Sequence, residues 1–213
     1  MAENIIRDKI RTAVQKEAKS GQLGRSLEKQ LTLLSDKLVL PDKEPVAALL
    51  QFITDYVESV PDCILLVSAV SKHMGFYDYA APFLDLAEDY FLHPPLDLPA
   101  DGGLEALLDE SFLAHRLLEE VNDHHIRHLH RPLLPLDMTE ANVIVHHLLG
   151  DALANQLDIK VHETAAKLLE REYLWTQVRA LPASSAPALQ LYKYDNLSWS
   201  SRRIRLRLAS AAS

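Results

Sequence analysis

The sequence predicts an all-α fold, an antiparallel bundle or stack of about seven helices that ends in a short β-like hairpin or extended tail. Three observations support this prediction. Leu and Ala dominate the composition and only 6 of the 213 residues are Gly, which favours helix. Apolar residues recur at helical spacing over most of residues 4–180. Alternation with a period of two, which is typical of strands, appears only near the end of the chain.

Five helices are predicted in the front half of the chain, residues 1–93. Ser26 can cap the second of them, and Gly75 ends the fourth. Pro45 and Pro61 suit the first turn of a helix, so each indicates a helix start. We therefore expect helices over about residues 4–19, 26–40, 45–59, 61–74 and 78–92.

One helical hairpin has a recognisable pattern. Gly75, Tyr77, Ala80 and Ala87 have the spacing of a helix pair with Gly at the turn and small residues at the crossing. This segment resembles one tetratricopeptide repeat, but no second copy lies at the repeat length in either direction. One repeat cannot bury its own faces, so the resemblance implies a helical hairpin and no peptide-binding role.

Two longer helices are predicted in the back half, residues 104–182, after a loop rich in Pro, Asp and Gly. The sixth helix spans about 104–130. The seventh begins after Asp137, which forms an Asp variant of the capping box with Glu140, and continues to about residue 180. Gly150 and Asp158 are the places where it could bend. Together the two halves form a single helical domain, residues 1–182.

Residues 183–213 form a linker and a basic C-terminal appendage. Residues 189–194 and 203–208 alternate between polar and apolar, which predicts a hairpin with Arg203, Arg205 and Arg207 on one face. This segment is an edge hairpin packed on the bundle, a loose chain end or a docking strand for a partner.

Charge is distributed unevenly along the chain, whose net charge is −8. Residues 38–182 carry 24 acidic and 9 basic residues, whereas both ends are basic. The acidic body argues against nucleic-acid binding, and the basic ends suit a protein partner or a homo-oligomer. No run approaches the roughly 18 apolar residues of a membrane span. With charges near the N-terminus and a single cysteine, Cys63, expected to be a buried and inert thiol, we expect a cytoplasmic protein.

Histidines cluster in residues 124–130 and again at His146 and His147. Projection of the sixth helix places His125 and His128 on its apolar side and His124 at the margin, whereas His115 and His130 fall on the opposite face. The pairs His124/His128 and His125/His128 have ligand spacing on a helix, as do His147 and Asp151 on the seventh. The predicted metal ligands are therefore His124, His125, His128, His147 and Asp151, for a divalent zinc, iron or manganese ion.

Simpler explanations exist for the same residues. His125 suits a core histidine bonded to a backbone carbonyl, and the polar line on the seventh helix suits a solvent-exposed face. The spacing of His124 and His128 resembles one element of the three-histidine metal site of DinB-like helical bundles, and the resemblance extends no further. Glu-x-x-His, His-Glu-x-x-His and Gly-rich phosphate loops are absent from the sequence.

Two functions follow from these patterns. The first is a non-catalytic helical interaction or scaffold protein that self-associates. The second is a metal-binding helical protein, a hydrolase or oxygenase, with a His/Asp cluster between the sixth and seventh helices. No catalytic residue is identified.

Overall fold

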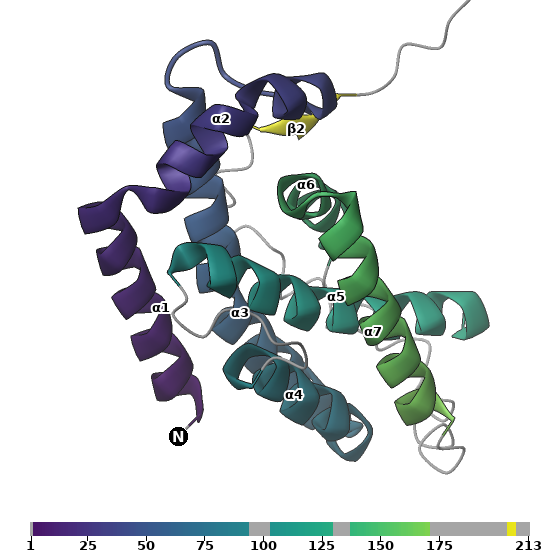
Figure 1. Ribbon diagram of the computed structural model, residues 1–213. Helices are drawn as coiled ribbons and strands as arrows, with labels where there is room; N and C mark the ends of the chain where they lie inside the picture. The colour runs from purple at the N-terminus through teal and green to yellow at the C-terminus, as the bar shows by residue number, and fades with distance from the viewer. Residues whose placement is uncertain (1, 94–102, 130–136, 171–203, 208–213) are drawn as a thin grey trace, which may run out of the picture.

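The computed structural model describes residues 2–93, 103–129, 137–170 and 204–207 (Figure 1). Within these residues, seven helices pack together beside a two-stranded antiparallel sheet, which confirms the predicted helical fold. The helices are α1 (Ala2–Ser20), α2 (Gln22–Lys37), α3 (Pro45–Met74), α4 (Tyr77–Leu92), α5 (Leu104–Leu129), α6 (Thr139–Leu149) and α7 (Asp151–Leu169). The strands are β1 (Leu38–Val39) and β2 (Arg205–Leu206).

The prediction of two helices over residues 45–74 was wrong, because α3 is one helix of 30 residues with Pro61 inside it. An internal Pro removes a backbone hydrogen bond and costs about 3 kcal/mol. Val57, Val60 and Cys63 lie around it and are almost completely buried. Burial of each such side chain contributes roughly 1.5–3 kcal/mol, so continuous packing outweighs the cost of Pro61. The predicted burial of Cys63 is confirmed, and this burial raises the pKa of the thiol to about 12.

The second helix begins earlier than predicted, at Gln22, so Ser26 is an interior residue rather than its cap. Gly21 precedes the helix in the left-handed conformation. The carboxylate of Glu17 accepts hydrogen bonds from the backbone N–H groups of Leu23 and Gly24, each at 3.0 Å. A side chain from α1 thus satisfies the free N–H groups that a capping Ser would otherwise bind.

The predicted seventh helix is divided by Gly150 into α6 and α7. Gly150 has φ 80° and ψ 148°, a conformation that is essentially restricted to Gly, so the chain breaks here rather than bends. The expected extension to residue 180 lies outside the described residues beyond 170.

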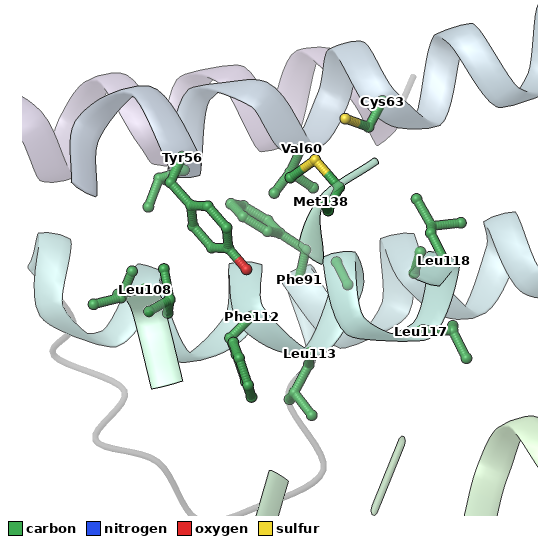
Figure 2. Packing of buried hydrophobic residues seen from close by; sticks show 14 of the residues in the cluster. Tyr56, Val60, Cys63, Phe91, Leu108, Phe112, Leu113, Leu117, Leu118 and Met138 are labelled. Atoms are coloured by element: carbon green, nitrogen blue, oxygen red, sulfur yellow. The ribbon is translucent and has the colours of Figure 1, made fainter. Parts of the chain in front are cut away.

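Helix α5 crosses the middle of the molecule and packs against α1, α3, α4, α6 and α7 (Figure 1). Figure 2 shows the core around two of these helices, with Tyr56 on α3 directed toward α5, Leu118 on α5 directed toward α3, and Phe112 on the opposite side of α5. A helix surrounded in this way has no continuous solvent face. The predicted outward position of His115 was therefore wrong, since its exposed fraction is only 1%.

The C-terminal segment returns to the front half of the chain. Leu206 pairs with Leu38 and Arg205 with Val39 in an antiparallel ladder. The predicted strand character of residues 203–208 is confirmed for Arg205–Leu206. The strand with which these residues pair is β1. The other predicted strand, residues 189–194, lies outside the described residues. No described helix is long and apolar enough to cross a membrane.

Replacement of Gly150 by Ala should destabilise the protein by about 1–3 kcal/mol, because a Cβ strains this backbone conformation. Space is not the cause, since nothing lies within 4 Å of the position that the Cβ would take. Gly103 is a matched control, because its surroundings are equally open and its φ is not in the left-handed range. Urea unfolding should show a lower free energy of unfolding for Gly150→Ala and no such decrease for Gly103→Ala. Equal effects of the two variants would show that backbone strain at residue 150 is not the cause.

Candidate functional site

A half-buried ion network joins α5 to α7. Nε of Arg116 donates to Oδ1 of Asp158 at 2.8 Å, and the same guanidinium donates to Oε2 of Glu119 one helical turn away. The three side chains are between 11% and 30% exposed. Burial lowers the pKa of Arg116, but the hydrogen bonds and negative charges of Asp158 and Glu119 outweigh burial and raise the pKa above its usual value, so the guanidinium keeps its charge.

The network continues to α6 and α3. Oε2 of Glu119 accepts a hydrogen bond from Nδ2 of Asn142 at 2.7 Å, and Oδ1 of Asn142 accepts one from the hydroxyl of Tyr56 at 2.7 Å. Burial raises the pKa of the Tyr56 phenol well above its usual value, so the phenol stays protonated and donates. Four helices are therefore connected through polar side chains at the centre of an otherwise apolar core.

His115 lies beside this network. Its Nε2 is 3.0 Å from Oγ of Ser59 and 3.2 Å from the carbonyl oxygen of Tyr56, and its ring meets the Tyr56 ring edge-on. Burial lowers the pKa of His115 to about 4. The imidazole is therefore neutral near pH 7 and serves as a core hydrogen-bonding group.

A group of metal-ligand type lies at the surface end of the network, where α6 meets α7. Ligand atoms of His146, His147 and Asp151 all lie within 4.8 Å of one another. The Nδ1 atom of His146 is 3.7 Å from Oδ1 of Asp151. His146 and His147 are half-buried, whereas Asp151 is exposed.

Hydrogen bonding orients the His146 ring. Its Nε2 is 3.2 Å from Oδ1 of Asn155 and 4.0 Å from Oδ2 of Asp158. In the tautomer with the proton on Nε2, the ring donates to Asn155 and leaves the Nδ1 lone pair free on the side of Asp151. Ligating histidines are held in this way, with the remote nitrogen donating to a carboxylate or carbonyl oxygen.

The charge state of His147 also suits a ligand. Partial burial, His146 and Lys37 lower the pKa of His147, and Asp151 opposes them. A lowered pKa keeps the imidazole neutral to lower pH. Protons therefore compete less with a cation for its lone pair.

Of the predicted ligands, the structure brings His147 and Asp151 together and adds His146. His124 is half-buried on α5 and does not belong to this group. The side chains of His125 and His128 lie outside the described part of the chain, so their participation stays a prediction. Sequence reasoning missed His146 because residues 146 and 151 point in different directions on a continuous helix, and only the break at Gly150 brings them to 3.7 Å.

Comparisons with known proteins give no match, whether with protein-family models, curated proteins or solved structures. Fold and site together define a helical protein in which a half-buried polar network leads to two imidazoles and a carboxylate at the surface.

Replacement of Arg116 by Met should cost about 3–5 kcal/mol, because it leaves Glu119 and Asp158 partly buried without their cation. Arg11→Met is the matched control. Arg11 also pairs with a carboxylate three residues away, Asp8, but both side chains are more than 60% exposed, so its loss should cost only about 0–1 kcal/mol. The free energy of unfolding of each variant, measured in urea, tests this difference. Similar decreases in the free energy of unfolding for both variants would contradict a structural role of the network.

Proposed function

We propose that this protein binds a divalent transition-metal ion where α6 meets α7, through His146, His147 and Asp151. The observation that supports this proposal is that the ligand atoms of the three residues lie within 4.8 Å of one another, with His146 held by its hydrogen bond to Asn155. Two imidazoles and one carboxylate form a ligand set for zinc, and iron or manganese are the alternatives.

The geometry needs little adjustment to hold an ion. Ligand atoms about 2.0–2.2 Å from a tetrahedral zinc ion lie roughly 3.3 Å apart. His146 and Asp151 are already at 3.7 Å, and the exposed Asp151 side chain can rotate without displacing core atoms. The half-buried imidazoles provide the more rigid part of the site.

Three protein ligands leave a coordination position for water or substrate. Metal hydrolases and oxygenases use sites of this kind, in which the ion lowers the pKa of bound water or activates a bound substrate. Asp158, 4.0 Å from Nε2 of His146, would orient the ligating ring and support its basicity.

Zinc titration of untagged protein by calorimetry, with the metal content confirmed by elemental analysis, tests this site. We expect one bound ion per chain and an affinity that falls at least about tenfold in His147→Ala and Asp151→Ala, because each variant removes a ligand. His73→Ala removes an exposed imidazole at the end of α3 and should bind zinc like the wild type.

Absence of stoichiometric binding with zinc, iron and manganese would refute the proposal. An equal loss in His73→Ala would also refute it, since the binding would then come from dispersed surface histidines. Circular dichroism of each variant separates a lost ligand from a lost fold.

We also propose an interaction function, in which the segment 204–207 of one copy docks on β1 of a second copy. The supporting observation is the docking of this segment within one chain. Ile204 is 1% exposed, and Arg207 donates from its backbone N–H to the carbonyl oxygen of Lys37 at 2.8 Å and from Nε to that of Ser35 at 3.0 Å. The 33 residues 171–203 can span up to roughly 110 Å, so chain length permits docking on either copy.

Light scattering after size exclusion tests this exchange. Docking within one chain has an effective concentration in the range of about 1 mM, so dimers should appear as the protein concentration approaches that value. Ile204→Asp should stay monomeric because it places a charge in the buried contact. Arg205→Asp introduces the same side chain at an exposed neighbour and should still dimerise. A wild type that is monomeric throughout, or a dimerising Ile204→Asp, would refute strand exchange.

A further inference from the structure

A second candidate site lies inside the fold, away from the histidines. A cavity of about 600 Å³ opens between the end of α1, α2, the beginning of α5 and the junction of α6 with α7. His146, His147 and Asp151 do not line it. Much of its wall is apolar, with Leu23, Leu27, Leu108, Leu149 and Leu153 among the lining residues.

Asp109 is the unusual group in this wall. It is only 7% exposed, and no described residue donates a hydrogen bond to it or forms an ion pair with it. The adjacent Glu110 is equally buried but binds Nζ of Lys9 at 2.6 Å. A buried carboxylate without a partner is costly in its charged form, and buried charges are normally paired.

The surroundings of Asp109 favour a cation. Burial, Glu105 and Glu110 raise the pKa of Asp109 to about 7, so a modest stabilisation by a ligand would ionise it. Three acidic residues line the cavity, Glu17, Glu105 and Asp109, against one basic residue among the described lining, Lys16. Glu17 is occupied at the start of α2, which leaves Asp109 and Glu105 facing the cavity.

We infer that this cavity binds a small organic amine, whose ammonium group pairs with Asp109 and whose apolar body lies against the leucines. The volume is within the range of about 300–1,000 Å³ for small-molecule sites, and the wall combines leucines with polar side chains, of which Asp109 is the buried carboxylate. The apolar wall provides affinity for the body of the ligand. The carboxylate selects the cationic head.

Fluorescence titration with dansylcadaverine, an apolar amine whose emission rises when it leaves water, tests this site. N-butyl dansylamide has the same ring system without the ammonium group. We expect the amine to bind at least about tenfold more tightly than the neutral probe at pH 8, because a charge-assisted contact is lost in the latter. Its affinity should rise about tenfold from pH 6 to pH 8, as Asp109, with Glu105, Glu110, Glu17 and Lys16 around it, becomes ionised.

Three variants locate the binding. Asp109→Asn should abolish both the preference for the amine and the pH dependence, and it should remain folded at pH 8 because it removes a buried charge. Glu163→Gln removes an exposed carboxylate on α7 and should change neither. Ser26→Phe places a ring at the cavity wall and should weaken both probes.

Absence of saturable binding, equal affinity for the two probes or an unchanged Asp109→Asn would each overturn the inference. So would an equal loss in Glu163→Gln, which would indicate attraction by the net negative charge of the protein, or undiminished binding by a folded Ser26→Phe, which would place the probe elsewhere.

Discussion

The guanidinium of Arg116, which is half-buried, connects α6 and α7 to the rest of the fold. Arg116 lies on the central helix α5 and binds Asp158 on α7 and Glu119 on its own helix. Glu119 in turn holds Asn142 of α6, which holds Tyr56 of α3. Gly150, between α6 and α7, has wide conformational freedom of its own. The break at Gly150 allows α6 and α7 to diverge and brings His146 to Asp151, and the contacts of both helices with α5 hold them in this arrangement.

Charge balance links this network to the surface group. Arg116 supplies one positive charge to two carboxylates, so the cluster is negative, and Asn142 donates to Glu119 while Nε2 of His146 lies 4.0 Å from Asp158. An excess of negative charge next to His146 favours a cation on the other side of its ring. The network therefore adds negative charge beside the group formed by His146, His147 and Asp151.

Periodicity in the sequence predicted the helices well but not their ends. The number seven agrees with the described residues because two errors cancel: α3 joins two predicted helices through Pro61, and Gly150 divides another. Both outcomes depend on packing against distant segments, which local patterns do not contain. Projection of a single helix placed His115 in solvent for the same reason, since it contains no information on the helices that surround α5. The pair His147/Asp151 was predictable from its spacing on a helix. The proximity of His146 to Asp151 was not, because it arises from the break at Gly150.

The C-terminal turn of α6 contributes residues to both candidate sites. The partial negative charge at this end of the helix favours a cation in each of them. Leu148 and Leu149 line the cavity, whereas His146 and His147 face α7. The last carbonyl groups of a helix carry about half a negative charge, which stabilises cations nearby. The helix is held from several sides, because Asn142 binds Glu119 of α5 and the buried side chains of Ile144, Val145 and Leu148 pack into the core. The end of α6 is therefore an electrostatic environment that favours positive charge on both of its sides, toward the cavity and toward α7.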